Sequence, residues 1–134
     1  MPRVNPIITS RKKPINSRTK GASAELELAK ILTALGFPAS RSQQQKGGAD
    51  SPDVVCKALS GFHIEAKITQ GCKMFSPAML AEWDAQAIRD AGGLSVPLVV
   101  HRWSRQTVWW VRVLQPGRRP YWQALPDFLA EVRA

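Results

Sequence analysis

The spacing of apolar residues changes along the chain from helical to strand-like and back, and this change limits the possible folds more than any other feature. From residue 21 to residue 36, apolar side chains recur every three or four positions, which predicts a helix that ends at Gly36. A Ser-Pro pair at 76–77 and a Gly-Gly pair at 92–93 predict the two ends of a second helix. Residues 126–133 predict a short third helix.

Between these helices, five segments are expected to be strands: 37–42, 53–56, 62–68, 96–102 and 107–114. The resulting order is helix, three strands, helix, two strands, helix (αβββαββα). This order indicates an α/β fold with a mixed central β-sheet flanked by helices. A chain of 134 residues has room for one such domain.

The charge balance points to a polyanionic partner. The chain has 19 Lys and Arg against 10 Asp and Glu, a net charge of +9, and a pI near 10.3. Nucleic acid is the first candidate and an anionic membrane surface the second. No apolar run is long enough to span a membrane, so we expect a soluble protein of the cytoplasm of a bacterial, archaeal or phage-infected host cell. Cys56 and Cys72 with two histidines do not form a recognisable zinc pattern.

Most of the excess charge lies in residues 1–20, which contain six basic residues and no acid. We expect this segment to be a flexible basic arm before a single domain at 21–134. Its candidate DNA contacts are Arg11, Lys12, Lys13, Arg18 and Lys20. A solubilising terminus is an equally good interpretation of the arm. Lys46, in the polar loop 43–51, is a further candidate for phosphate, with a simple connector as the alternative.

Three acidic positions are unusual for solvated surface charges. Glu25 belongs to the stripe of the first helix that is expected to face the sheet, whereas Glu27 points away. The members of that stripe are Ala22, Glu25, Leu26, Leu28, Ala29, Leu32 and Leu35. Asp53 follows a proline directly before a strand, and Glu65 shares one strand face with His63 and Lys67. The ordinary alternatives are a helix N-terminal carboxylate, a turn and a Glu-Lys ion pair.

Asp53 and Glu65 lie on the two strands of one predicted hairpin and are expected to approach each other. Neighbouring carboxylates repel unless a proton or a cation neutralises them, and Mg²⁺ or Mn²⁺ prefers hard oxygen ligands. Lys67 beside them would orient an attacking water and offset charge on a phosphate. We assign no catalytic role to His63, which flanks this face. The pattern predicts acids that bind a cation next to a phosphate.

Three short motifs, in their order along the chain, resemble the motifs of the PD-(D/E)xK nuclease superfamily. They are the run Lys20-Gly21-x-x-x-Glu25, the pair Pro52-Asp53 and the run Glu65-Ala66-Lys67. The resemblance is closest to the small archaeal-type Holliday-junction resolvases, and it covers about residues 20–114. It implies a restriction-endonuclease-like core and Mg²⁺-dependent hydrolysis of phosphodiester bonds.

The same resemblance implies that Glu25, Asp53 and Glu65 surround the metal and that Lys67 lies beside the water. By the same resemblance, Arg41 is similar to a family arginine that meets the DNA backbone. Gln86, on the second helix, is similar in position to a supporting polar residue.

We therefore predict a metal-dependent DNA endonuclease that resolves four-way junctions as a homodimer, because two symmetric sites explain paired cuts. The basic arm, the insertion 71–77 and the pair Trp109-Trp110 depart from the family pattern and leave the branched substrate open. One tryptophan of that pair is expected in the core and the other at the dimer interface. The alternatives are a nuclease of this superfamily acting on another DNA, such as a restriction-like, nicking or repair enzyme, and a nucleic-acid-binding protein without catalysis.

Overall fold

The computed structural model describes residues 17–42 and 52–134, which form a six-stranded sheet with helices on both faces. In chain order the elements are α2 (Ser17–Ala34), β1 (Ala39–Arg41), β2 (Val54–Cys56), the 3-10 helix η1 (Lys57–Leu59), β3 (Phe62–Thr69), α3 (Pro77–Ala91), β4 (Val96–Trp103), β5 (Trp110–Val113), β6 (Tyr121–Ala124) and α4 (Leu125–Arg133). The mixed α/β fold expected from the sequence is confirmed. None of the described helices is long and apolar enough to cross a membrane.

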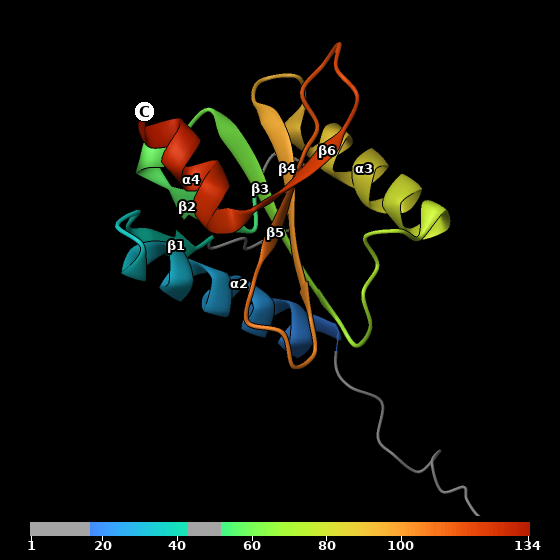
Figure 1. The fold of residues 1–134 in the computed structure, drawn as a ribbon, viewed down its shortest axis with the longest axis horizontal. Coiled ribbons are helices and arrows are strands. Elements are labelled where there is room, and N and C mark those ends of the chain that lie inside the picture. Colours follow the sequence, from blue (N-terminus) through green and yellow to red (C-terminus); the bar gives the residue numbers. More distant parts are fainter. Residues whose placement is uncertain (1–16, 43–51) are drawn as a thin grey trace, which may run out of the picture.

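The strands follow one another across the sheet in the order β1-β2-β3-β4-β5-β6. Only β3 and β4 are parallel, and their register runs from Phe62 opposite Val96 to Thr69 opposite Trp103. A parallel pair needs a crossover connection, and α3 supplies it. The helices α2 and α4 cover one face of the sheet and α3 covers the other (Figure 1).

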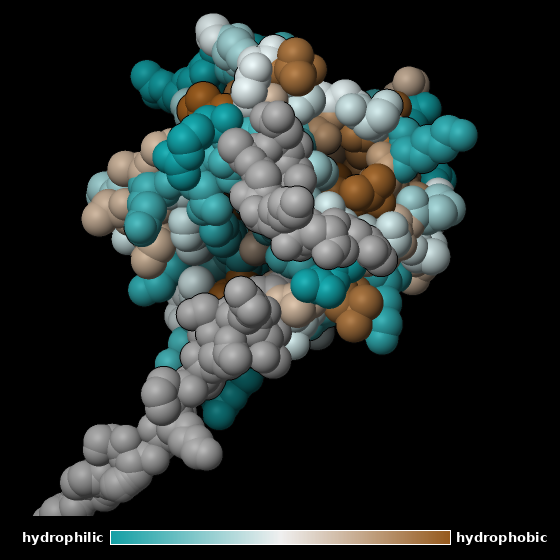
Figure 2. Space-filling view, turned by 180° about the vertical axis from the view of Figure 1, so that it is seen from behind, coloured by the Kyte–Doolittle hydropathy of each residue, from teal (hydrophilic) through white to brown (hydrophobic). Residues whose placement is uncertain are grey.

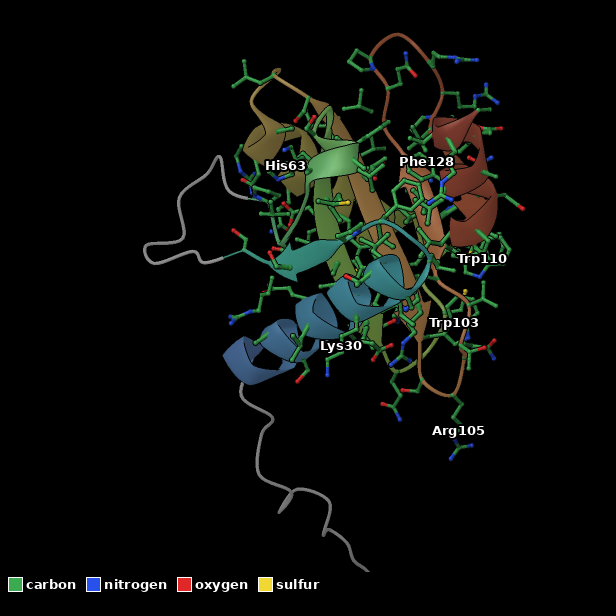
Figure 3. The ribbon with its side chains drawn as sticks, turned by 90° about the vertical axis from the view of Figure 1, so that its left-hand side faces the viewer. Lys30, His63, Trp103, Arg105, Trp110 and Phe128 are labelled. Carbon is green, nitrogen blue, oxygen red and sulfur yellow. The ribbon has the colours of Figure 1, made fainter. Side chains whose placement is uncertain are left out.

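The larger hydrophobic core lies between the sheet and the pair α2 and α4. Leu28 from α2 and Phe128 from α4 meet Ile64 and Val111 of the sheet in one buried cluster. Phe128 lies between α4 and the sheet, with its ring centroid 5.3 Å from that of Phe62 (Figure 3). On the other face, Trp83 and Ala87 of α3 pack on Val99 and Leu114 in a smaller cluster. The larger apolar cluster therefore lies on the α2 and α4 side of the sheet, and the smaller one lies under α3.

The boundaries of α3 agree with the sequence signals. The Ser76 hydroxyl accepts a hydrogen bond from the Met79 amide at 3.4 Å, and Pro77 occupies the first helical position. Gly92 ends the helix in the left-handed conformation, with φ of 63°. These local contacts fix where α3 begins and ends, and hence which of its residues reach β3.

Three details of the fold differ from the sequence predictions. The first helix begins at Ser17, inside the segment that was assigned to the arm. A sixth strand, β6, adds to the five expected, because a run of only four residues after Pro120 is too short for a pattern of alternation. Leu26 and Leu35 are exposed, so the buried stripe of α2 is narrower than predicted.

Two long-range ion pairs join the helices to the sheet. Arg102 of β4 donates two hydrogen bonds to Glu27 of α2, so Glu27 does not point away from the sheet as expected. Arg112 of β5 makes a bidentate pair with Asp84 of α3, at 2.9 and 3.0 Å. These contacts hold α2 and α3 at defined positions along the strands.

The tryptophan pair is divided as alternation requires. Trp109 is buried in the core, and Trp110 is only partly buried on the other side of the strand. The face of the molecule opposite to that of Figure 1 is mainly hydrophilic, and its apolar residues form separate groups (Figure 2). The expectation that the second tryptophan lies at a dimer interface stays a prediction.

The narrow stripe of α2 allows a matched test of the core. Leu28 is 0 % exposed and Leu26 is 48 % exposed on the same helix. Leu28→Ala should lower the free energy of unfolding by about 2–5 kcal/mol, because it removes buried surface and leaves a cavity. Leu26→Ala should change it by less than about 1 kcal/mol. Urea unfolding of both variants checks this, and equal losses would contradict the packing of α2.

Candidate active site

The site lies where β2 separates from β3. The two strands pair through Val54 opposite Ile64, and the Asp53 amide donates to the Ile64 carbonyl at 2.8 Å. Strand β3 continues to Thr69, whereas the chain on its β2 side is no longer a strand. Because β2 is so short, the next part of β3 is open to side chains from other elements.

Asp53 occupies this opening. Its carboxylate oxygen Oδ2 accepts a hydrogen bond from the Ala66 amide at 2.9 Å, at a point that a longer β2 would have paired with backbone. Pro52 before it favours an extended backbone for the residue that precedes the proline, which helps to direct the chain into β2. The predicted approach of Asp53 to the strand that carries Glu65 is therefore built by one backbone hydrogen bond.

The surroundings of Asp53 disfavour its charged form. Burial first, and then the negative charges of Glu65 and Glu25, raise the pKa of Asp53 to about 7. The Ala66 hydrogen bond and the positive charge of Lys67 act in the opposite direction. The acids expected from the sequence to cluster therefore interact electrostatically, and the cluster carries more negative charge than its protein partners offset.

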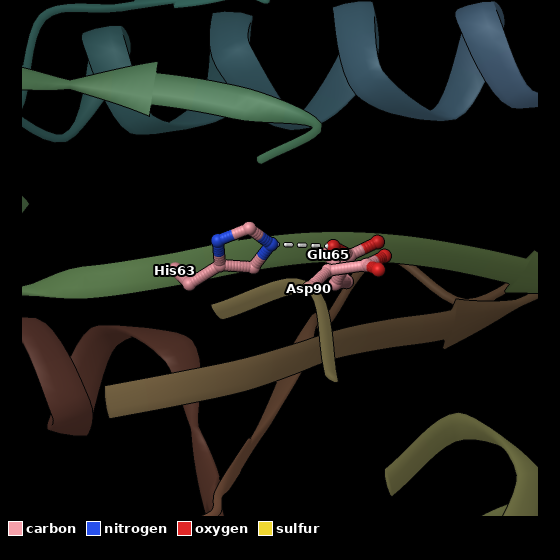
Figure 4. A group of neighbouring side chains, drawn as sticks. All are labelled: His63, Glu65 and Asp90. Carbon is pink, nitrogen blue, oxygen red and sulfur yellow. Dashed lines mark hydrogen bonds and ion pairs between the residues drawn. The ribbon is translucent and has the colours of Figure 1, made fainter. Parts of the chain in front are cut away.

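Glu65 and Lys67 lie on the side of β3 that faces α3. Glu65 is 2 % exposed, and its Oε2 lies 2.7 Å from Nε2 of His63, which is equally enclosed (Figure 4). The Lys67 ammonium donates to Oε1 of Gln86 at 2.9 Å. Glu65 and Lys67 do not form an ion pair with each other among the described residues. Such a pair was the ordinary alternative for this motif.

Glu25 reaches the same region from α2. Its carboxylate binds the Arg41 guanidinium of β1, with Nε and Oε1 2.8 Å apart, and its charge acts on Asp53. Arg41 keeps half of its side chain exposed, so it borders the acids and still faces solvent. The predicted DNA contact and a predicted metal ligand are therefore neighbours.

Helix α3 contributes one acid that the sequence motifs did not indicate. Asp90 lies four residues after Gln86 and therefore on the same side of the helix. Its carboxylate, the Glu65 carboxylate and the His63 imidazole have ligand atoms within 4.8 Å of one another. In the sequence, only its spacing from Gln86 pointed to Asp90. That spacing indicates a position near β3 once Gln86 is known to contact Lys67.

His101 is a second buried histidine that no motif indicated. It lies beside Lys67 in the register of β3 and β4 and is 0 % exposed. Its Nδ1 lies 3.0 Å from the Lys67 carbonyl, and its Nε2 accepts the Lys73 amide at 3.2 Å. Burial lowers its pKa, so the neutral ring holds the end of β3 to the chain that follows.

The donor set fits a hard divalent cation. Asp53, Glu65 and Glu25 offer carboxylate oxygens, and burial together with the charges of Glu65 and Glu25 raises the pKa of Asp53, an effect that a bound cation would oppose. Lys67 does not fill that role, because its ammonium is held by Gln86. Asp53 and Glu65 are the residues that would hold the ion, with Glu25 next to them.

Some predicted contacts cannot be placed. Arg11, Lys12, Lys13 and Lys46 lie outside the described residues. Arg18 and Lys20 lie in the first turns of α2, and only their backbone is described. The basic arm therefore stays a sequence prediction.

The raised pKa of Asp53 gives a prediction for the metal-free protein. Between about pH 4 and pH 7 the folded state keeps a proton that the unfolded chain has released, so this group makes stability fall as pH rises through that range. Asp53→Asn retains an acceptor for Ala66 and removes the charge. The variant should gain stability over wild type as pH rises from 4 to 7, by at most about 1.4 kcal/mol per pH unit.

Chemical unfolding in a chelator at several pH values checks this, with the exposed Glu131→Gln as the matched control. Addition of Mg²⁺ should reverse the ranking, because the ion stabilises only the protein that retains the carboxylate. If the free energy of unfolding changed with pH in the same way for wild type and Asp53→Asn, the pKa of Asp53 would not be raised by its surroundings.

Comparison with known proteins bears on the fold and the family of the chain. The fold is similar to that of Hjc from Archaeoglobus fulgidus, a Holliday junction resolvase from an archaeal hyperthermophile, with a TM-score of 0.50 and 19% identity over 85% of this chain and 100% of that chain. No curated protein sequence matched the chain. A family model described as phage putative PDDEXK endonuclease matches residues 16–119, which include all of the motif residues named above. The chain belongs to this family of phage putative PDDEXK endonucleases.

Proposed function

We propose that this chain is a divalent-metal-dependent DNA endonuclease that cuts four-way junctions as a homodimer. The observation that carries the proposal is the position of Asp53, whose carboxylate lies against β3 between the charges of Glu65 and Glu25. Family membership supports a nuclease, and the Hjc-like fold supports the choice of a branched substrate. We expect the protein to act in the cytoplasm of a bacterial, archaeal or phage-infected host cell.

In the proposed site, Asp53 and Glu65 would hold the cation, and Glu25 would complete the shell through water. A divalent cation in this place would lower the pKa of bound water and offset charge on the phosphate. Mg²⁺ or Mn²⁺ fits the oxygen ligands. The contribution of the chain is to keep these carboxylates together against their repulsion, which the Ala66 amide does for Asp53.

Lys67 is the group that meets the reacting atoms. Its ammonium, held by Gln86, orients the attacking water and faces the phosphate. In hydrolysis, the water oxygen bonds to phosphorus, one P–O ester bond breaks, and the leaving oxygen takes a proton. The products are a phosphate monoester and a hydroxyl. Gln86 acts as a positioning residue, because it touches the lysine and not the substrate.

The basic residues hold the DNA backbone without reading its sequence. Arg41 borders the acids with an exposed side chain, and the arm and Lys46 carry further positive charge. A homodimer would present two such sites related by a twofold axis, which suits symmetric cuts in opposing strands. Two rivals remain: the same chemistry on another DNA, and DNA binding without catalysis.

One assay separates these possibilities. A synthetic four-way junction and a linear duplex of the same sequence are incubated with Mg²⁺ and with wild type or Asp53→Asn. Wild type should make paired cuts in the junction alone. Asp53→Asn should lose at least about a hundredfold of the rate and retain binding, because the carboxylate acts in the chemical step.

Equal cutting of the duplex would refute the choice of junction, and the absence of cutting with any divalent ion would refute the enzyme. Sedimentation of the complex, with one junction per two chains, checks the dimer. A single chain per junction with paired cuts would contradict it.

The role of Gln86 has its own test. Gln86→Leu should lower kcat by about 10- to 100-fold with KM for DNA unchanged, because Lys67 loses the acceptor that orients it. Gln86→Glu retains an oxygen at this position and should recover most of the rate. The exposed Glu82→Gln, one turn earlier on α3, is the matched control. A change in KM alone would show that Gln86 contacts DNA instead.

A further inference from the structure

The side of β3 that faces α3 carries a second group of metal-ligating side chains, next to the proposed catalytic acids. It consists of His63 and Glu65 from β3 and Asp90 from α3 (Figure 4). The helix runs so that Gln86 meets Lys67 and, one turn later, Asp90 meets Glu65. Residues on two successive turns of α3 thus lie next to two residues of β3 that share the face toward this helix.

The spacing of the three side chains suits one ion. Ligand atoms at about 2.1 Å from an ion lie roughly 3 Å apart when adjacent and about 4 Å apart when opposite. The imidazole nitrogen and the two carboxylate oxygens already lie within 4.8 Å of one another, and Nε2 of His63 is 2.7 Å from Oε2 of Glu65. Small side-chain rotations would bring all three onto a common ion.

Asp90 occupies a partly enclosed position next to another acid. It lies in the last turn of α3, where the helix dipole is negative, and its side chain is only 19% exposed. It also adjoins Glu65, which is almost fully buried. Among the described residues, Asp90 forms an ion pair with Arg89 at 3.8 Å, and the Arg89 side chain is exposed. A cation placed between Asp90 and Glu65 would neutralise charge on both carboxylates.

The third ligand distinguishes this group from an ordinary acidic cluster. His63 is 4 % exposed, and its Nε2 points at the carboxylates. Mg²⁺ binds oxygen and takes imidazole poorly, whereas Mn²⁺ and the later transition ions accept it. The donor set is therefore one nitrogen and two oxygens.

We propose that His63, Glu65 and Asp90 form a second cation position that takes a divalent transition-metal ion and shares Glu65 with the proposed catalytic position. Glu65 has two oxygens, of which Oε2 faces His63. This cation position goes beyond the proposed function. It needs no DNA, so metal binding can be tested without a cleavage assay. We therefore expect Mn²⁺ to fill both positions and Mg²⁺ to fill only the proposed catalytic position.

The test measures Mn²⁺ binding to the untagged full chain by electron paramagnetic resonance. Wild type should bind two Mn²⁺ per chain, and pulsed spectra should show coupling to an imidazole nitrogen. The chain has two histidines, and both nitrogens of His101 already have protein partners, so such a signal assigns His63. Labelling with ¹⁵N-histidine changes the coupling and identifies it without any substitution.

Variants separate the two positions. His63→Gln should abolish the nitrogen coupling, and His63→Gln and Asp90→Asn should each weaken one of the two ions by at least about tenfold. Asp53→Asn is the matched control, which should weaken the other ion and retain the nitrogen coupling. Circular dichroism verifies the fold of each variant, and the labelled wild type gives an answer even if a variant does not fold.

A single Mn²⁺ per chain, or a wild-type spectrum without imidazole coupling, would overturn the proposal. So would a coupling that survives His63→Gln. Two ions with the expected coupling but no cleavage of any DNA would leave this site standing and refute only the proposed function. Cleavage with one bound ion and no coupling would do the reverse.

Discussion

The hydrogen bond from the Ala66 amide to the Asp53 carboxylate is the contact on which the site depends. Among the described residues, β2 is only three residues long and pairs with β3 no further than Ile64, so the Ala66 amide on that edge binds the Asp53 carboxylate instead. A longer β2 would pair this amide with backbone and displace the carboxylate. The early end of the pairing between β2 and β3 thus places the Asp53 carboxylate against the sheet, where burial first, and then the charges of Glu65 and Glu25, raise its pKa.

Helix α3 provides the second support. The bidentate pair of Arg112 and Asp84, with Trp83 packed on the sheet, sets the position of the helix along β3. Gln86 and Asp90 then meet the functional face of the strand. Because one rigid helix carries both, the orientation of Lys67 and the geometry around Glu65 are linked. A shift of α3 would disturb the proposed catalytic position and the proposed transition-metal position together.

The distribution of charge follows from the same arrangement. Five carboxylate or imidazole side chains are linked by contacts or by charge in a protein whose net charge is +9, and Arg41 pairs with one of them, Glu25. Those five are Glu25, Asp53, His63, Glu65 and Asp90. Basic surface favours phosphate, and local acid favours cations. A metal ion bound between the acids and a phosphate would be consistent with both the basic surface and the local acids.

The sequence by itself determined the helix ends at Ser76 and Gly92, the alternation along β3 and the order of the motif residues, because these depend on neighbours in the chain. It did not reveal β6, the exposure of Leu26 beside the buried Leu28, or the role of Asp90. These depend on which faces of separate elements meet. The spacing of Gln86 and Asp90 was visible in the sequence, but only the packing of α3 on the sheet decided that this pair faces Lys67 and Glu65.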